Sequence, residues 1–270
     1  MSDSWLFMLA ADGTHERFIG PYVVAVLSTF PDARVEIIVP DVGHVFRKQT
    51  ELYEFLDVEF GDRVLLRQPA EHTKHVCAMD VRWLDPPLLQ ADYTYTGDID
   101  ILIVDDQLQN IHKNNMRLLE QCYSNRIREG QKRLTGLHCV RNADYFPAVA
   151  EEQRRLASIW EMWKGSRSEF LLYDLVEKTL GLPQLGVLRP LHGPHLSVGR
   201  NPHGGQKTRQ RQDPGWGGVN NANYMSRYRD LTEKDIWKQA FPLFPPEYRA
   251  MIDQLEEIGK EVGTLPAADG

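Results

Sequence analysis

The sequence has little cysteine and no long apolar run. Its three cysteines, Cys77, Cys122 and Cys139, are an odd number at wide spacing, with no C-x-x-C pair. This excludes a disulfide framework and a cysteine zinc site, and it favours the reducing cytoplasm as the compartment. No apolar run approaches the ~20 residues that a membrane-spanning helix needs. The opening Met-Ser-Asp-Ser-Trp also lacks the basic region of a signal peptide. We therefore expect a soluble protein without a membrane span, and peripheral membrane association stays open.

The sequence also lacks a positive charge excess. It has 31 basic and 38 acidic residues among 270, a net charge of −7, which argues against nucleic acid as a partner. One stretch differs from the rest. Residues 178–212, the acid-free segment, hold six basic residues and no acidic one, so they carry +6 and the remainder carries −13. This distribution favours a local site for a small anion.

The order of apolar segments predicts an α/β fold. A continuous apolar run at 5–11, a helical pattern at 18–30 and a second apolar run at 35–39 alternate as strand, helix and strand. No internal repeat is visible, and 42% apolar and 26% charged residues are typical of a globular chain. We expect further strands at 64–66, 93–96, 101–104, 134–140 and 187–191, and further helices at 78–89, 147–163, 169–180 and 248–262.

The C-terminal quarter has a different composition. Residues 199–223 are rich in Gly, Asn, Gln and Arg and have almost no apolar residue. A stretch of this length without periodicity is either a linker or a functional loop. We expect a catalytic domain at 1–200, followed at 201–270 by this loop and a helical extension. The loop is interpreted as a lid over an anionic ligand, contacted by Arg200, Lys207, Arg209 or Arg211, or as an ordinary solvated basic loop.

The sharpest local feature is a D-x-D triplet, Asp98-Ile99-Asp100, between strand-like segments. Gly97, just before the triplet, eases a turn that would bring the two carboxylates toward one site. Carboxylate oxygens are the ligands that Mg²⁺ and Mn²⁺ prefer, with positions left open for substrate phosphates. The alternative is that the aspartates only cap backbone amides at a strand end.

An apolar strand followed by D-x-D about a hundred residues into an α/β chain resembles the metal-binding signature of GT-A-fold glycosyltransferases. The first strand running into Ala10, Ala11 and Asp12 resembles the nucleotide-binding loop of that fold, and Arg82 resembles a basic residue that lies near the nucleotide. The resemblance covers residues 5–200. It implies a Rossmann-like mixed central sheet flanked by helices.

The resemblance also implies a histidine as third metal ligand beside Asp98 and Asp100. The segment from His192 to Arg200 is similar to the histidine motif of these enzymes, but it lacks the Lys-Pro-Trp ending of glycogenin-like retaining members. Both His192 and His195 are therefore candidate ligands, with His195 preferred. Whether transfer retains or inverts the sugar stereochemistry stays open.

Three residues are candidates for direct catalysis. The segments 123–125 and 133–138 resemble the part of the family that lines the donor sugar and the acceptor, which includes His138. Glu169 resembles an acidic position on the acceptor side, where it would act as general base or stabilise positive charge, and Asp174 is a second candidate. The alternatives are that Glu169 only complements the helix dipole and that His138 belongs to the core.

Together these features imply a metal-dependent, hexosyltransferase-like enzyme. It would use Mn²⁺ or Mg²⁺ and a nucleotide-diphosphate sugar, first of all a UDP-sugar. Its acceptor would be a saccharide or glycoconjugate, as in bacterial surface-polysaccharide assembly. The alternative is a non-catalytic nucleotide-sugar or protein-binding module on the same fold. A haloacid-dehalogenase-like phosphatase is disfavoured, because Ala10 stands at the position of the nucleophile.

Overall fold

The computed structural model describes residues 3–128, 131–162, 168–196 and 217–266. Its centre is a six-stranded sheet of order β3-β2-β1-β4-β6-β5, in which β3, β2, β1 and β4 are parallel and β6 is antiparallel to both neighbours. The predicted mixed α/β sheet is thus confirmed. The strands are β1 (Trp5–Ala10), β2 (Arg34–Ile38), β3 (Val64–Arg67), β4 (Tyr93–Thr96), β5 (Tyr123–Ser124) and β6 (His138–Arg141).

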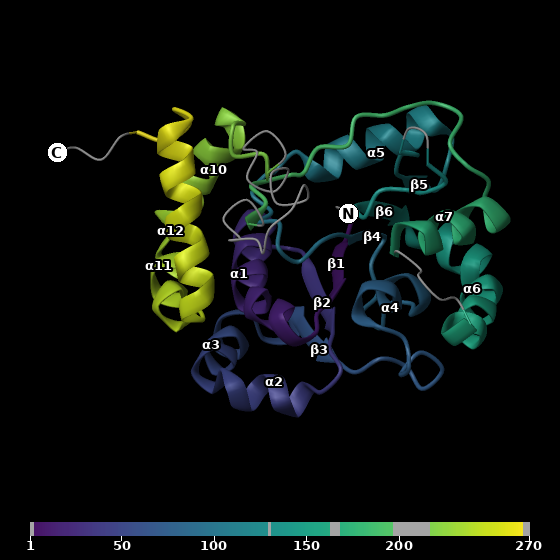
Figure 1. The fold of residues 1–270 in the computed structure, drawn as a ribbon, viewed down its shortest axis with the longest axis horizontal. Coiled ribbons are helices and arrows are strands. Elements are labelled where there is room, and N and C mark those ends of the chain that lie inside the picture. Colours follow the sequence, from purple (N-terminus) through teal and green to yellow (C-terminus); the bar gives the residue numbers. More distant parts are fainter. Residues whose placement is uncertain (1–2, 129–130, 163–167, 197–216, 267–270) are drawn as a thin grey trace.

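Helices cover both faces of the sheet (Figure 1). Because side chains alternate along β1, Phe7 and Leu9 join the apolar cluster of one face while Leu6 and Met8 join that of the other. The first cluster includes residues of α1, α3, α5 and the C-terminal helices, and the second includes residues of α4, α6 and α7. The helices are α1 (Ile19–Thr29), α2 (Val42–Lys48), α3 (Thr50–Phe60), α4 (Ala78–Leu84), α5 (Leu108–Leu119), α6 (Asn142–Ile159), α7 (Ser168–Thr179), α10 (Ala222–Thr232), α11 (Asp235–Ala240) and α12 (Pro246–Glu261).

The C-terminal helices form an outer layer against α1 (Figure 1). Aromatic rings join the two layers: Tyr248 of α12 packs edge-on against Phe18, and Phe244 packs against both Tyr248 and Trp237. The predicted C-terminal helix is confirmed, and its apolar face completes the same core that β1 begins. No helix in the described ranges is long and apolar enough to cross a membrane.

The segments 101–104 and 187–191 were both expected to be strands, and neither joins the sheet. Both edges of β4 are already paired, one with β1 and the other with β6, so no position beside it remains for residues 101–104. That segment instead forms an isolated antiparallel bridge, Ile101 to His195. Its apolar side chains are still buried in the core of the α1 face.

Helix boundaries also differ from the expectation. Helix α6 begins at Asn142, so Pro147 lies inside it instead of in its first turn and removes one helical hydrogen bond. Helix α4 ends at Leu84, just before Asp85 and two prolines, instead of at residue 89. Helix α5 was not expected at all, because its sequence is mostly polar and only one side of it is buried.

A buried ion-pair network joins β2, β3 and the loop after α4. Arg67 donates to Glu36 at 2.7 Å and to Asp85 at 2.8 Å, and the two carboxylates are 0% and 1% exposed. Glu36 also accepts hydrogen bonds from the amides of Leu88 and Leu89. Burial of charge is tolerated here because each group is paired and hydrogen-bonded.

Candidate functional site

The candidate site lies at the carboxyl edge of the parallel strands. The register pairs Met8 of β1 with Thr96 of β4, so Ala10 and the D-x-D turn leave the sheet at the same edge. Ala11 donates its amide to the Ile38 carbonyl, and the chain then enters a 3-10 helix after Asp12. The predicted nucleotide-binding residues Ala10, Ala11 and Asp12 are therefore at the same edge as the candidate metal ligands.

The D-x-D segment forms the predicted turn. The amide of Ile101 donates to the Asp98 carbonyl at 3.2 Å, which bends the chain between the two aspartates. Glycine is required just before it, because a Cβ at Gly97 would lie 2.8 Å from Cε1 of the buried Tyr95 ring. The turn leaves the Asp98 side chain 40% exposed and the Asp100 side chain 10% exposed.

Arg82 of α4 holds one side of this turn. Its Nη2 lies 3.1 Å from Asp98 Oδ1, and its Nη1 donates to the Gly97 carbonyl. The Arg82 side chain is 9% exposed, and its guanidinium lies over the Trp83 ring. The predicted proximity of Arg82 to the site is thus seen, although its partner in the described structure is Asp98 itself.

The segment that contains His195 lies directly beside the turn. Leu102 donates its amide to the Pro194 carbonyl at 3.0 Å, and Leu196 donates to the Asp100 carbonyl at 2.9 Å. These antiparallel backbone bonds bring His195 Nε2 to 3.7 Å from Asp100 Oδ1. Two of the predicted ligands, far apart in the chain, are therefore side by side.

Gly193 permits this close approach. A Cβ at this position would lie 1.7 Å from the Leu102 carbonyl oxygen, so any other residue would separate the two segments. Gly193 stands within the histidine motif, and nothing in the sequence itself indicates this role. Its requirement is steric and comes from the neighbouring backbone.

His192 is not available as a metal ligand, which corrects that prediction. Its side chain is fully buried, with Nδ1 3.3 Å from Asp105 Oδ2 and Nε2 3.0 Å from His112 Nε2. Both ring nitrogens are thus occupied. The amide of His192 also lies 3.1 Å from the Tyr224 hydroxyl of α10.

His192 belongs to a buried chain of hydrogen bonds that continues from His112 Nδ1 to Ser124 Oγ at 2.8 Å. One direction satisfies every group: Ser124 donates to His112, His112 donates to His192, and His192 donates to Asp105. Burial lowers the pKa of His112 well below its usual value and also lowers that of His192, although Asp105 opposes the second shift. The chain links α5, β5 and the segment that carries His195.

The residues present suit a cation held by two protein ligands. Within the described ranges, no three His, Cys, Asp or Glu side chains come close enough to hold a metal ion. Asp100 and His195 do approach each other, whereas Asp98 turns to Arg82. Mg²⁺-type sites commonly use one or two carboxylates and complete their coordination with substrate phosphates and water. The pair fits that pattern, and the expected three-ligand cluster is not assembled.

Glu169 lies at the start of α7 and is held by two arginines. Its Oε1 lies 2.8 Å from Arg128 Nη2 and accepts the Gly136 amide at 3.1 Å, while its Oε2 lies 3.1 Å from Arg133 Nη1. Gly136 in turn borders the D-x-D turn, since a Cβ there would lie 3.3 Å from Asp98 Oδ1. Glu169 is therefore near the site, with both oxygens engaged in ion pairs.

The other two catalytic candidates are outside the D-x-D turn, although His138 is paired with Thr96 just before it. His138 is 2% exposed, and its ring lies among the rings of Trp83, Tyr123 and Tyr145, so its burial favours a core role. Asp174 is half-buried on α7; burial and then Glu177 raise its pKa, and Lys178 opposes the shift. None of the groups that act on Asp174 belongs to the D-x-D turn.

The basic acid-free segment is described only in part. Arg200 and Lys207 lie outside the described residues. Lys178 pairs with Glu152 of α6 at 3.2 Å. Arg189 does not stand out in the sequence pattern, but it is the described basic residue of this segment on whose guanidinium both Asp98 and Glu169 act electrostatically. The signal that could have found it was its place in the acid-free segment.

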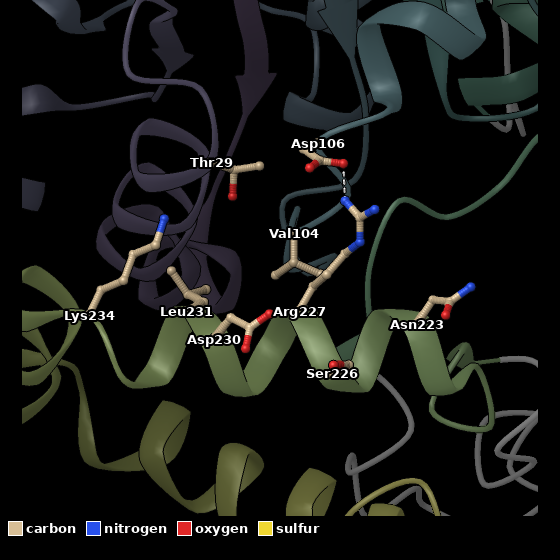
Figure 2. Close-up of a pocket in the computed structure, with 9 residues that line it drawn as sticks. All are labelled: Thr29, Val104, Asp106, Asn223, Ser226, Arg227, Asp230, Leu231 and Lys234. Atoms are coloured by element: carbon tan, nitrogen blue, oxygen red, sulfur yellow. Dashed lines mark hydrogen bonds and ion pairs between the residues drawn. The ribbon is translucent and has the colours of Figure 1, made fainter.

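A pocket lies at the opposite edge of the sheet from the candidate site. It is a cleft of about 580 Å³ between α10 and the C-terminal end of α1, lined by both signs of charge (Figure 2). Arg227 crosses toward Asp106 and also lies 3.3 Å from Asp105 Oδ1. Because β1 and β2 are parallel, the end of α1 at Thr29 lies near their amino ends, away from the D-x-D turn. The ion pair between Arg227 and Asp105 ties α10 to the acceptor end of the His192 chain.

No protein-family model matches the chain, and no curated protein matches it in sequence. Solved structures of glycosyltransferases are similar to it. The galactosyltransferase LgtC, in complex with donor and acceptor sugar analogues, aligns at 15% identity over 64% of this chain and 70% of that chain, with a TM-score of 0.42. An active-site variant of LgtC aligns at 13% identity over 92% and 99% of the chains, with a TM-score of 0.42.

The glycosyltransferase GlyE of Streptococcus pneumoniae TIGR4 aligns at 12% identity over 66% of this chain, with a TM-score of 0.45. The alignment spans 43% of the GlyE chain.

Proposed function

We propose that the chain transfers a sugar from a nucleotide-diphosphate sugar to a hydroxyl of a saccharide or glycoconjugate, with a divalent cation bound by Asp100 and His195. The observation that supports this proposal is the 3.7 Å approach of Asp100 Oδ1 and His195 Nε2 at the carboxyl edge of β1 and β4. In open α/β sheets, this edge is where ligands bind.

The chemistry of the two ligands favours Mn²⁺. Carboxylate oxygens suit Mg²⁺ and Mn²⁺, whereas imidazole nitrogen suits transition metals, and Mn²⁺ accepts both. When bound, the cation would offset the negative charge that develops on the leaving diphosphate. Asp100 and His195 would hold it from the protein side, and diphosphate oxygens and water would complete its coordination.

Other residues of the chain would fix the D-x-D turn and receive the nucleoside. Arg82 fixes Asp98 and the Gly97 carbonyl, so the shape of the turn is set before any ligand arrives. The end of β1 at Ala10 would receive the nucleoside, for which the family resemblance suggests UDP as the first donor to test. Glu169, held by two arginines and the Gly136 amide, fixes the loop that borders Asp98 and contributes negative charge beside it.

Thermal unfolding with a panel of nucleoside diphosphates, with and without Mn²⁺, tests this proposal. A ligand that binds only the folded state at a hundred times its Kd adds about 2.7 kcal/mol of stability. We expect UDP or another member to stabilise the wild type only with Mn²⁺. Asp100→Asn should lose that Mn²⁺-dependent part, because its neutral amide is a poor cation ligand.

The matched control is Asp144→Asn on α6, since Asp144 is an exposed partner of Arg141 away from the turn. It should keep the full Mn²⁺-dependent shift. A folded Asp100→Asn variant that also keeps it would contradict the proposed cation site. Slow release of free sugar from the stabilising donor then distinguishes a transferase from the alternative, a binding module, which would bind without release.

A further inference from the structure

Four arginines act on the groups around the site, and three of them are engaged by protein acceptors. Arg82 is held by the D-x-D turn, and Arg128 and Arg133 are held by Glu169. Arg189 makes no hydrogen bond or ion pair with any residue that the structure describes, and its Nη1 is buried without a hydrogen-bond partner. A buried donor without an acceptor costs free energy, and a bound anion would supply the missing acceptor for this guanidinium.

The surroundings of Arg189 sharpen that requirement. Burial lowers the pKa of its guanidinium, Tyr95 and Asp98 oppose the shift, and Arg128 adds to it. Arg128 is thus a like charge that acts on the Arg189 guanidinium. The Tyr95 hydroxyl, beside Gly97, is a second polar group that is buried without a partner among the described residues.

The side chains around Arg189 keep an excess of positive charge after the charges of the nucleotide-sugar donor and its cation are included. Asp98 is offset by Arg82, and a divalent cation would offset the two negative charges of a nucleotide-sugar diphosphate. Glu169 supplies one negative charge against the three guanidinium groups of Arg128, Arg133 and Arg189. These four groups carry two positive charges in excess, and the Asp100 carboxylate that would hold the cation reduces the net charge of the site to +1, which remains for a second anion.

We propose that Arg189 and Arg128 bind a carboxylate or phosphate group of the acceptor, so that the preferred acceptor is an acidic saccharide. The guanidinium fork matches either group with two parallel hydrogen bonds, and this recognition is stronger than that of a neutral hydroxyl. The inference rests on the proposed function, because it assigns the second anion to the second substrate.

A glycan array with matched neutral, uronic-acid, sialylated and phosphorylated members tests it. The probe is the labelled chain with Mn²⁺ and the nucleoside diphosphate that stabilises it. We expect retention of anionic members over their neutral counterparts, with uronic and phosphorylated members showing which group is preferred. Arg189→Met should reduce that preference about tenfold or more, the usual effect of losing a charge-assisted hydrogen bond.

Two further variants control for folding and charge. Arg189→Lys keeps the charge but loses the fork, so it should keep part of the preference, and its retention on the array is measured beside that of Arg189→Met. Arg155→Met removes an arginine that pairs with Glu152 on α6, and it should leave the preference unchanged.

The outcomes separate the inference from the proposed function. An array on which no anionic glycan is retained above its neutral counterpart overturns the inference. So does an Arg189→Met variant whose glycan preference is intact while its nucleoside-diphosphate affinity falls, since Arg189 would then serve the donor. Absence of any nucleoside-diphosphate binding by the wild type, measured first on the same preparation, removes the proposed function and the inference together.

Discussion

His138 offers a direct test of whether the polar groups beneath the site are structural. Its Nδ1 lies 3.0 Å from Asn125 Nδ2, its Nε2 has no partner, and burial lowers its pKa to about 3. Such a histidine stays neutral in the folded chain at pH 5, whereas in the unfolded chain it has a pKa near 6.5 and binds a proton. Stability is therefore fully present above pH 6.5 and is lost as the pH falls below it.

The size of the effect follows from these two pKa values. Between pH 7 and pH 5, proton binding to this one histidine in the unfolded state lowers the free energy of unfolding by about 2 kcal/mol. His138→Phe removes that contribution, and the aromatic neighbours accommodate the new ring. His112 and His192 titrate in the same direction in both proteins, so the comparison isolates His138.

Urea unfolding followed by tryptophan fluorescence at pH 7 and pH 5 measures the difference. The loss of stability on acidification should be about 2 kcal/mol smaller in His138→Phe than in the wild type. Equal losses in the two proteins would refute the reasoning. Loss of sugar transfer by a folded His138→Phe variant would restore the catalytic interpretation of this residue.

Three other changes have definite expected outcomes. Gly193→Ala would place a Cβ 1.7 Å from the Leu102 carbonyl oxygen, so the two segments must separate. Calorimetric titration should then show a Mn²⁺-dependent nucleotide affinity that is reduced about tenfold or more. Gly186→Ala is the control and should leave that affinity unchanged, because a Cβ there would have no atom within 4 Å. Arg67→Met leaves two buried carboxylates without their partner and should cost about 3–5 kcal/mol in urea unfolding; a loss under about 1 kcal/mol would contradict the network. Glu169→Gln should lower the free energy of unfolding by about 1–3 kcal/mol. An unchanged urea midpoint would show that the ion pairs with Arg128 and Arg133 do not contribute to stability.

The sequence predicted the parallel half of the fold because its strands are buried on both faces. The segments at β1 and β2 are nearly continuous apolar runs, and each is followed by a turn. Residues 101–104 carry the same signal and are equally buried, yet they are not in the sheet. Apolar composition reports burial, whereas membership in the sheet depends on whether a neighbouring strand has a free edge.

In the candidate site, too, features set by neighbouring residues in the sequence were predictable, and features set by distant residues were not. The D-x-D turn was predictable because Gly97, which eases a bend, stands next to the two aspartates in the sequence. The choice between His192 and His195 was not, because it depends on Asp105 and His112, which are distant in sequence from both histidines. Arg189 was not predicted for a related reason. Its Nη1 has no hydrogen-bond partner in the part of the chain that the structure describes, and a sequence does not display which charges are paired.

The measurement that tests the central claim most directly is a double-mutant cycle on Asp100 and His195. Calorimetric titration of the stabilising nucleoside diphosphate, with and without Mn²⁺, would compare Asp100→Asn, His195→Gln and the double variant. If the two side chains hold one cation, each single change removes most of the Mn²⁺-dependent affinity, and the double variant loses no more, which gives a coupling of about 1 kcal/mol or more. Additive losses, or Mn²⁺-dependent affinity retained in either folded single variant, would contradict the account.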